Sequence, residues 1–385
     1  MSTNNKINIT YLVSRLRRQG PIFQLYNIIK HLDTSRFHPR IITLSPETED
    51  SLMDDFKNLG LDCTSLSLSR KTDMILGPGK LKSIFEKSLP DLIHVSGLRS
   101  TIICAYHLRS IPAVVTCRQT FDSMHYKLNG DPWLMSRIKT SFFSSACKKV
   151  DCIVAVSWAV KDSAKPELAS RIRVIHNGVN QDVYKPSDPK TKAHMREKLG
   201  LPQNKLIFLS TGFLSERKDP ITVIKGFLKN QKSHSSELIL LGDGSLSQKC
   251  SAMAHRANNI RVVGFVNNVS NYLASSDVFV SGSLFEGCPN SVIEALACGL
   301  GVILSDIEPH REILAFDDKA GVTFKVGDAD SLAEAISQID QHKCSVQSQA
   351  ALRIVNDHLN ARRMSLKYQQ IYIELFNKHF GERNS

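Results

Sequence analysis

Residues 277–306 read DVFVSGSLFEGCPNSVIEALACGLGVILSD, and this stretch decides the fold. Both of its ends are short apolar runs, as buried parallel strands are. Between them Ser291-Val-Ile-Glu294 matches a capping box, which predicts a helix that begins at Ser291 and ends where Gly299 can form a left-handed cap. A strand, a helix and a second strand of these lengths predict a βαβ unit with parallel strands.

The same alternation runs through most of the chain in two successive arrays. Strands are expected at 7–13, 40–45, 91–96, 113–117, 152–157 and 172–175, and again at 205–212, 237–244, 260–266, 277–283 and 301–306. Helical patterns lie between them, at 22–32, 80–89, 221–230, 291–299 and 331–339. The polar, proline-containing segment 177–190 predicts a linker between the arrays.

The fold class expected from this order is α/β, with two Rossmann-like doubly wound domains that face each other across a cleft. We expect residues 1–178 to form an N-terminal acceptor domain and residues 179–363 a C-terminal donor domain. The helical pattern at the end of the chain, about 364–385, is expected to pack back on the first domain. Ligands of such sheets bind at the carboxyl ends of the strands, so a cleft between two of them suits two substrates.

Composition narrows the class of protein. The chain has 385 residues, a formal net charge of +12 and a pI of about 9.2, which favours anionic partners. Its basic residues are not interleaved with aromatic ones as in nucleic-acid-binding surfaces, so no nucleic-acid partner is expected. The N-terminus shows no leader pattern, and the apolar runs are about half as long as the ~20 residues of a membrane span.

We therefore expect a cytoplasmic protein that can also lie peripherally on the inner face of the membrane. The helical pattern at 131–150 mixes apolar and basic residues. It fits either contact with anionic lipid headgroups or an ordinary amphipathic surface helix.

Two glutamates in the opening stretch differ in their local explanations. Glu294 would lie in the first helical turn, where a capping role needs no ligand. Glu286 lies in a Gly/Pro loop at a strand's carboxyl end, which makes it a better ligand candidate than Glu294, and it fits either a ligand contact or a solvated loop charge. The start of the helix between them exposes backbone N–H groups, and these form an anion site suited to phosphate.

The segment EGCPNSVIEALACGLGVILSD resembles the Glu-x7-Glu signature of family 4 retaining glycosyltransferases, which have the two-Rossmann GT-B fold. Other segments are similar to family motifs in the same order. These are RVIHNGVNQDVYKP (173–186), GFLSERKDP (212–220), LGDGSL (241–246), IRVVGFV (260–266) and the following SDVFV. The resemblance covers most of the chain.

The resemblance implies a role for each matching residue. Glu286 would bind the donor sugar's hydroxyls, and Glu294 would bind the ribose. Lys218 would neutralise the diphosphate leaving group, the loop at Gly20 would close over it, and the backbone near Val266 would hold the base. Backbone groups of the next segment would contact sugar and phosphates: Gly287, Cys288, Pro289, Asn290, Ser291 and Val292.

Three positions depart from the family pattern. Phe213 stands where the family has an arginine, and Arg217 beside Lys218 either replaces that charge or is solvated. Arg118 stands where the family often has a histidine close to the donor sugar, so it is either a sugar or acceptor contact or a surface arginine. Asn180 replaces an aspartate in the interdomain segment.

The tripeptide Asp328-Ala-Asp330 spells a metal-binding motif of another glycosyltransferase fold. Its position before a helical pattern favours an N-cap at Asp330 or Ser331 instead. We therefore expect no essential metal and no cofactor.

The function expected from the resemblance is metal-independent, retaining transfer of a sugar from a nucleotide-diphospho-sugar, with UDP the family's commonest nucleotide. The acceptor would be a glycan or a lipid-linked molecule in surface polysaccharide or lipopolysaccharide synthesis. Two alternatives stay open at this point: a sugar-nucleotide epimerase of the same fold, and a nucleotide-sugar or glycan-binding protein without turnover.

Overall fold

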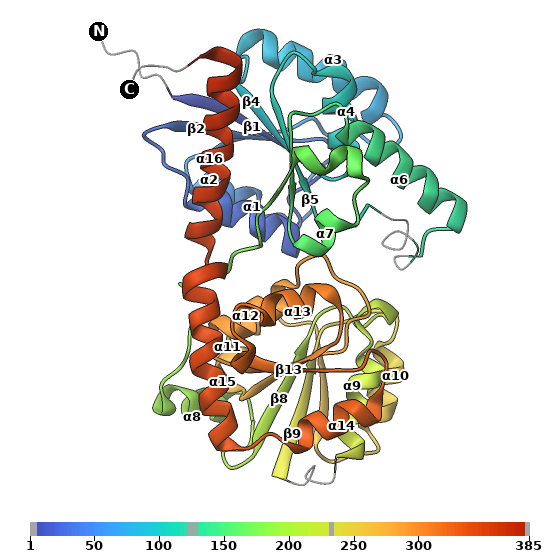
Figure 1. Ribbon diagram of the computed structural model, residues 1–385, viewed down its shortest axis with the longest axis vertical. Helices are drawn as coiled ribbons and strands as arrows, with labels where there is room; N and C mark the ends of the chain where they lie inside the picture. The colour runs from blue at the N-terminus through green and yellow to red at the C-terminus, as the bar shows by residue number, and fades with distance from the viewer. Residues whose placement is uncertain (1–5, 119, 122–126, 128–129, 231–234, 382–385) are drawn as a thin grey trace. The chain divides into compact units, whose positions relative to one another are not determined.

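A computed structural model describes the whole chain except residues 1–5, 119, 122–126, 128–129, 231–234 and 382–385 (Figure 1). The first five residues of the chain and the last four of the expected C-terminal helix therefore lie outside the described residues. The chain forms two compact units, Met1–Asn177 together with Ala361–Ser385, and Gly178–Asn360.

The first domain is built on a seven-stranded parallel sheet in the order β3-β2-β1-β4-β5-β6-β7. The strands are β1 (Ile7–Val13), β2 (Phe37–Thr43), β3 (Asp62–Ser65), β4 (Leu92–Ser96), β5 (Ala113–Cys117), β6 (Cys152–Ala155) and β7 (Ile172–Val174). Six of them were expected. The sequence pattern missed β3, because DCTS is a short, partly exposed edge strand without an apolar run.

Helices cover this sheet and bring in the end of the chain. They are α1 (Gly20–Lys30), α2 (Met53–Asn58), α3 (Asp73–Lys87), α4 (Leu98–His107), α6 (Trp133–Cys147), α7 (Trp158–Asp162) and α16 (Ala361–Phe380). Figure 1 shows the last helix, α16, beside the first strands of the chain, although these segments are far apart in the sequence.

Buried polar contacts fix α16 against the sheet. The Tyr372 hydroxyl lies 2.7 Å from Nδ1 of His94, and Nε2 of the same ring lies 2.6 Å from the Thr116 hydroxyl. Burial lowers the pKa of His94 to about 3, so the ring is neutral at pH 7. These directional bonds specify how α16 lies on β4 and β5, which apolar packing alone does not.

The second domain is built on a six-stranded parallel sheet in the order β10-β9-β8-β11-β12-β13. The strands are β8 (Leu206–Thr211), β9 (Ser236–Leu241), β10 (Ile260–Gly264), β11 (Val278–Ser281), β12 (Gly301–Ser305) and β13 (Gly321–Phe324). Only β13 was not expected. Its sequence, GVTF, has four residues, and of these only Phe324 is buried, so the strand leaves no clear apolar pattern.

The helices of the second domain are α8 (Pro189–Lys198), α9 (Pro220–Lys229), α10 (Ser247–Ala254), α11 (Val269–Ser275), α12 (Asn290–Ala297), α13 (Glu308–Leu314), α14 (Ala329–Ser337) and α15 (Gln341–Ile354). A π-helical turn, Val355–Leu359, separates α15 from α16 and ends this unit. The segment 177–190 is not a loose linker: Val179 is buried and pairs with Asn360, and Tyr184 packs on the same core.

Both sheets are therefore doubly wound and parallel, which confirms the expected fold class. The strand order reverses between β1 and β4 in the first sheet and between β8 and β11 in the second. Loops that leave the carboxyl ends of these strand pairs diverge to opposite faces, and the crevice between them is where doubly wound folds bind ligands. In the second domain these are the loops that carry Lys218 and Glu286.

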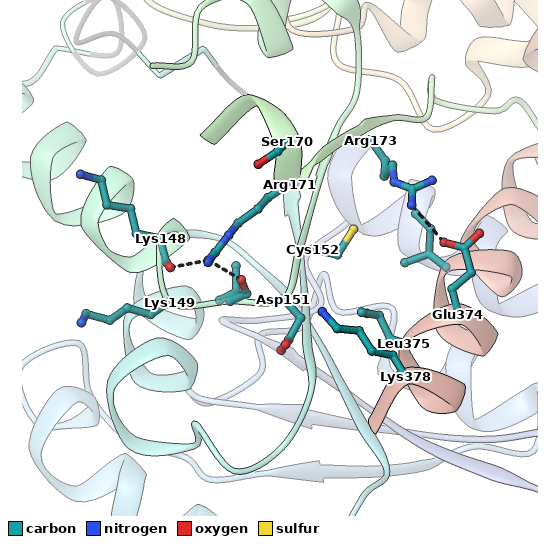
Figure 2. Close-up of a pocket in the computed structure, with 12 residues that line it drawn as sticks. Lys148, Lys149, Asp151, Cys152, Ser170, Arg171, Arg173, Glu374, Leu375 and Lys378 are labelled. Atoms are coloured by element: carbon teal, nitrogen blue, oxygen red, sulfur yellow. Dashed lines mark hydrogen bonds and ion pairs between the residues drawn. The ribbon is translucent and has the colours of Figure 1, made fainter. Parts of the chain in front are cut away.

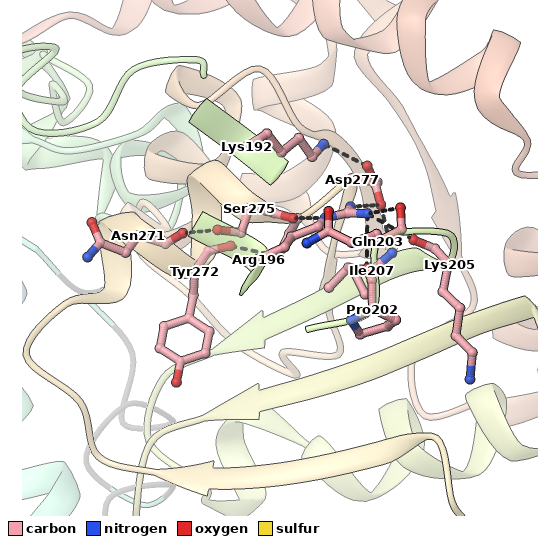
Figure 3. Close-up of polar contacts among 11 residues, drawn as sticks. Lys192, Arg196, Pro202, Gln203, Lys205, Ile207, Asn271, Tyr272, Ser275 and Asp277 are labelled. Carbon is pink, nitrogen blue, oxygen red and sulfur yellow. Dashed lines mark hydrogen bonds and ion pairs between the residues drawn. The ribbon is translucent and has the colours of Figure 1, made fainter. Parts of the chain in front are cut away.

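A buried ion-pair network anchors the opposite, amino edge of the second sheet (Figure 3). Asp277 precedes β11, and its carboxylate accepts from Arg196 at 2.6 Å, Lys192 at 2.6 Å and the Ile207 amide at 2.7 Å. The Arg196 and Asp277 side chains are only 7% and 11% exposed. The network joins α8 to the starts of β8 and β11, the two strands that carry the site at their other ends.

Substituting Asp277→Asn is expected to lower the free energy of unfolding by about 3 kcal/mol, because it leaves the Arg196 guanidinium buried without its counter-charge. Urea unfolding monitored by circular dichroism measures this. The matched control is Asp330→Asn, which removes a carboxylate that is 79% exposed and bonded to Lys229. That control should change stability by less than about 1 kcal/mol, and equal effects of the two substitutions would contradict the assignment.

Candidate active site

Close packing of glycine-containing loops forms the carboxyl edge of the second sheet. A Cβ atom on Gly242, whose φ is +129°, would stand 1.9 Å from the carbonyl oxygen of Gly212. A Cβ on Gly282 would stand 2.8 Å from the carbonyl oxygen of Asp219. The loop after β8 therefore lies directly on the loops after β9 and β11, and only glycine allows that approach.

The backbone also joins the two loops that diverge at the switch point. The Leu284 amide donates to the Arg217 carbonyl at 2.8 Å. Asp219 adopts a left-handed conformation at φ +43° and caps α9 through the Thr222 amide. A non-glycine residue in that conformation is strained, and such strain is concentrated at functional sites.

Glu286 is the centre of an ion-pair cluster in these loops. Its carboxylate accepts from Lys218 Nζ at 2.5 Å, from Arg217 at 3.0 Å and from the Ser283 hydroxyl at 2.9 Å. Glu286 is only 8% exposed, while the Lys218 and Arg217 side chains are 17% and 21% exposed. None of the three is a solvated loop charge, so that interpretation is wrong for Glu286 and Arg217.

The cluster keeps Glu286 ionised. Burial by itself raises the pKa of this carboxyl, but the positive charges of Lys218 and Arg217 outweigh burial and lower the pKa to about 2. Such a carboxylate is a weak base at neutral pH, suited to accepting hydrogen bonds rather than removing a proton. Two cations on one carboxylate leave a net positive charge beside the start of α12.

Glu294 does not cap a helix, which corrects the capping-box prediction. The helix α12 begins at Asn290, its N-cap is Pro289, and no side chain caps it. The proline has no amide hydrogen to donate to a glutamate side chain, and the helix starts one residue earlier than expected, which puts Ser291 inside it rather than at the cap.

The Glu294 carboxylate has no hydrogen-bond partner among the residues that the structure describes. Burial raises its pKa to about 7, and the charge of Lys218 opposes that rise only in part. Lys218 therefore acts on both carboxyl groups, but near pH 7 Glu294 is about half protonated whereas Glu286 is ionised. A partly buried, unpaired carboxyl group is costly, and such groups are typical of functional sites.

His310 is a further polar residue of this site that the sequence analysis missed. It is fully buried at the start of α13, and its Nδ1 lies 2.8 Å from the Ser305 carbonyl oxygen. That carbonyl accepts, so Nδ1 carries the proton and Nε2 is an acceptor without a partner among the described residues. Burial lowers the pKa of His310 to about 4, and Glu286 and Lys218 lie within range of its charge.

The signal that would have pointed to His310 is positional. It follows β12, the strand next to β11, at the same edge of the sheet as Glu286. A polar residue soon after the carboxyl end of a strand adjoining a switch point is a site candidate.

The other residues expected in the donor site lie at the same edge. Val266 follows β10 and packs against the domain core, and Cys288 packs there as well. The residues from Gly287 to Val292 form the end of the loop and the first turn of α12. Phe213, which stands where the family has an arginine, is 63% exposed, and its apolar ring cannot make the charged contacts of an arginine.

Two expected site residues belong to the first domain. Gly20 is the first residue of α1, after the loop that leaves β1. Arg118 directly follows β5, is exposed, and lies beside Gly97 at the carboxyl end of β4. Both lie at the carboxyl edge of the first sheet, the edge at which such a domain binds ligands.

The tripeptide Asp328-Ala-Asp330 caps a helix, although the capping residue differs from the expectation. Asp328 is the N-cap of α14, and its carboxylate accepts from the amides of Asp330 and Ser331. Asp330 instead lies in the first helical turn and pairs with Lys229. The helix begins two residues earlier than the apolar pattern indicated, so the first acidic residue takes the cap.

Comparison with protein families gives two matches that together span most of the chain. Residues 191–351 match the family described as glycosyl transferases group 1, and residues 23–183 match glycosyltransferase family 4. A similar protein in Escherichia coli, UDP-Gal:alpha-D-GlcNAc-diphosphoundecaprenol alpha-1,3-galactosyltransferase, is 25% identical over 81% of this chain and 82% of its own length. The O-antigen biosynthesis glycosyltransferase WclY of Escherichia coli is 23% identical over 97% of this chain and 99% of its own length.

Solved structures show the same fold at lower identity. HepE of Anabaena in complex with UDP and glucose has a TM-score of 0.78 at 17% identity, covering 95% of this chain and 99% of its own. Sucrose-phosphate synthase of Thermosynechococcus elongatus has a TM-score of 0.81 at 18% identity, covering 97% of this chain and 100% of its own. With two doubly wound domains, the Glu-x7-Glu segment at a switch point and both family matches, the chain belongs to the family 4 glycosyltransferases of the GT-B fold.

Proposed function

We propose that this glycosyltransferase transfers a sugar from a UDP-sugar, with retention of anomeric configuration and without a metal, to a glycan or lipid-linked acceptor in surface polysaccharide biosynthesis. The observation that carries the proposal is the cluster of Glu286, Lys218 and Arg217 at the switch point of the second sheet. It places fixed cations beside a buried carboxylate where this fold binds its ligand.

In the proposed mechanism, negative charge develops on the diphosphate as the bond to the sugar breaks. Lys218 and Arg217 are already held in place by Glu286, so they stabilise that charge without reorganisation. They supply the positive charge that a metal ion would otherwise supply. Glu286 remains ionised and accepts hydrogen bonds from the sugar's hydroxyls, orienting the ring for departure of the leaving group.

Glu294 and the start of α12 complete the proposed donor site. The unpaired Glu294 carboxylate accepts from the ribose hydroxyls, which offer the partners that it lacks among the described residues. The first turn of α12, which no side chain caps, offers backbone donors and the positive end of a helix dipole to phosphate. Gly20 and Arg118 belong to the acceptor domain in this proposal.

Two findings support the choice of donor and acceptor. The galactosyltransferase of Escherichia coli has UDP-Gal as its donor and a diphosphoundecaprenol-linked acceptor, and it aligns with most of this chain. WclY is an O-antigen biosynthesis enzyme that aligns over nearly the whole length of both chains. Retention is supported by the resemblance of residues 286–294 to the retaining family's signature.

The experiment that tests the proposal begins with a thermal-shift screen of nucleotide sugars. A donor present at a hundred times its dissociation constant stabilises the folded state by about 2.7 kcal/mol, which corresponds to about 5–10 °C. The selected donor is then incubated with a short-chain N-acetylglucosamine-diphospho-lipid, and the coupling constant of the anomeric proton in the product is measured by NMR. A product of inverted configuration, or a transfer abolished by EDTA, would refute that part of the proposal.

The ionisation of Glu294 predicts how donor binding depends on pH. If the ionised form binds ribose, the apparent dissociation constant of UDP-glucose is expected to be flat above about pH 8, because the pKa of Glu294 is about 7. It should rise about fivefold from pH 7 to pH 6 and about tenfold from pH 6 to pH 5, because only the deprotonated fraction binds. UDP-glucose is the probe because both its phosphates are esterified and lack the second ionisation of a monoester near pH 6.

The control for this measurement is Glu294→Gln, whose amide cannot ionise. Its calorimetric binding profile should be weaker than that of the wild type at pH 8 and level between pH 5 and pH 8. A wild-type profile that is flat, or that strengthens toward low pH, would contradict the proposed role of Glu294.

We also propose that the protein contacts an anionic membrane peripherally, through the exposed face of α6. Leu134, Ile138 and Phe142 lie at helical spacing and are 61%, 40% and 54% exposed, whereas a solvated helix face carries polar residues. Arg137 lies over the Trp133 ring at 5.0 Å, so positive charge borders the apolar stripe. No helix in the described part of the chain has the length and apolar character that a membrane span requires.

The double substitution Ile138→Ser with Phe142→Ser is expected to weaken sedimentation with phosphatidylglycerol vesicles at low salt by about a hundredfold, about tenfold for each side chain removed from the interface. Leu89→Ser is the matched control, since Leu89 is 67% exposed in the same domain but lies outside α6. Equal vesicle binding of wild type and the double variant would exclude α6 as the contact.

A further inference from the structure

A polar crevice of about 450 Å³ lies at the amino edge of the first sheet (Figure 2). It is lined by the residues just after α6, by those that precede β6 and β7, and by the last turns of α16. Gly20 and Arg118 follow the carboxyl ends of the strands of this sheet, so the crevice lies at the edge opposite to the proposed acceptor site. Its volume falls in the range of small-molecule sites.

The lining of the crevice has an excess of positive charge. Its basic side chains are Lys148, Lys149, Arg171, Arg173 and Lys378, and its acidic side chains are Asp151 and Glu374. Outside the lining, Glu167 pairs with Lys148 at 2.6 Å. Even when this carboxylate is included, two positive charges remain.

The ion pairs leave particular cations available. Arg173 pairs with Glu374 at 3.1 Å. Within the described part of the chain, Arg171 donates only to the carbonyl oxygens of Lys148 and Val150, which hold its guanidinium in place without neutralising it. Lys378 extends from α16 in Figure 2 and makes no ion pair or hydrogen bond with any residue that the structure describes.

Helix dipoles account for only part of this charge. The carboxyl-terminal ends of α6 and α16 both lie at the crevice, and each is equivalent to about half a negative charge. Together they offset about one of the two excess cations. The crevice therefore combines a fixed guanidinium, an unpaired ammonium group and residual positive charge in one concave site. Such a site is suited to phosphate, because Arg contacts phosphate with two parallel N–H groups and Lys contacts it as a point charge.

We propose that this crevice binds a phosphate group, as a second anion site separate from the donor site and not required for sugar transfer itself. Two sources share this chemistry: a soluble phosphomonoester and the phosphate of an anionic lipid headgroup. The lipid source has a structural route, because Lys149 lies two residues beyond the end of α6, the helix that carries Phe142. The Lys149 ammonium lies over the exposed Tyr106 ring, 5.2 Å from its centroid.

The test uses the full chain with the charge reversal Lys378→Glu, at an exposed residue whose side chain makes no hydrogen bond or ion pair within the described part of the chain. Lys87→Glu is the matched control, because Lys87 is an exposed residue in the last turn of α3 and changes the net charge equally. One arm titrates glycerol 1-phosphate by calorimetry. The other measures sedimentation with phosphatidylglycerol vesicles, and thermal unfolding and UDP binding are recorded for each variant.

If the source is soluble, Lys378→Glu weakens glycerol phosphate binding about tenfold or more, as expected for one lost charge-assisted bond, and Lys87→Glu changes it less than twofold. If the source is lipid, the same contrast appears in vesicle binding and not in the titration. The proposal is overturned if the two variants behave alike in both arms, or if wild type binds neither probe. UDP binding should be equal in wild type and both variants, so that a failure here is distinct from a failure of the donor site.

Discussion

Glu286→Gln is expected to lower the rate constant of sugar transfer by about a thousandfold while the protein stays folded. The substitution keeps the shape of the side chain but removes the charge that holds Lys218 and Arg217 in place. Loss of one preorganised group in such a site costs about a hundredfold to a thousandfold in rate. The upper end applies because Glu286 is bonded to both cations and is proposed to bind the sugar as well.

The same variant should separate catalysis from binding. Without Glu286, Lys218 and Arg217 keep their charge but lose their counter-ion, so UDP is expected to bind as tightly as in wild type, or more tightly. Stopped-flow turnover, calorimetry with UDP and circular dichroism measure rate, binding and folding in turn. The control is Glu308→Gln, an exposed glutamate at the same edge of the sheet, which should keep its rate within twofold of wild type. If the Glu286→Gln enzyme is folded and its rate is near normal, Glu286 is not an active-site residue.

Lys218→Met is expected to lower kcat/KM by about a hundredfold to a thousandfold, and unlike Glu286→Gln it should also weaken UDP binding. Methionine keeps the length of the side chain, whose Cε atom passes close to Gly212, but removes the cation proposed to meet the diphosphate. Removing one donor to developing negative charge costs about 2.7–4 kcal/mol. The charge-assisted bond to the ground-state diphosphate adds a smaller loss of affinity, about tenfold or more.

The control for this variant is Lys225→Met on α9, an exposed lysine outside the cluster. It should leave turnover and UDP binding within twofold of wild type. Because Lys218 lowers the pKa of Glu286, the methionine variant should also need a higher pH to keep Glu286 ionised. Equal losses of kcat/KM in the two lysine variants would show that the effect of Lys218→Met comes from the loss of any lysine charge and not from the place of Lys218 in the site.

The periodicity of the sequence was sufficient for the sheets but not for their weakest strands. Runs such as 205–212 and 301–306 are apolar on both faces because helices cover both sides of a parallel sheet, and that pattern is visible without a structure. The edge strands β3 and β13 have four residues each and are partly exposed, so burial leaves little mark on their composition. Their place is decided by pairing with β2 and β12.

Helix starts were predicted less well than helices, for a reason visible at both incorrect caps. At α12 the prediction relied on Ser291 and Glu294, but the chain enters the helix through Pro289, and no side chain caps it. At α14 it relied on the start of the apolar pattern, but Asp328 turns two residues earlier. Caps depend on the direction from which the chain arrives, which side-chain patterns do not record.

The sequence alone determined the fold class, the two-domain order and the stretch from Glu286 to Glu294 as the place to look, because these depend on periodicity and on a local motif. Only the tertiary structure decided which of those charges act together. Lys218 and Glu286 are 68 positions apart in the chain, yet they form one ion pair because β8 and β11 are neighbours at the point where the strand order reverses. The structure likewise removed the capping role of Glu294 and added His310 to the site, since burial and electrostatic surroundings arise from residues that are distant in sequence.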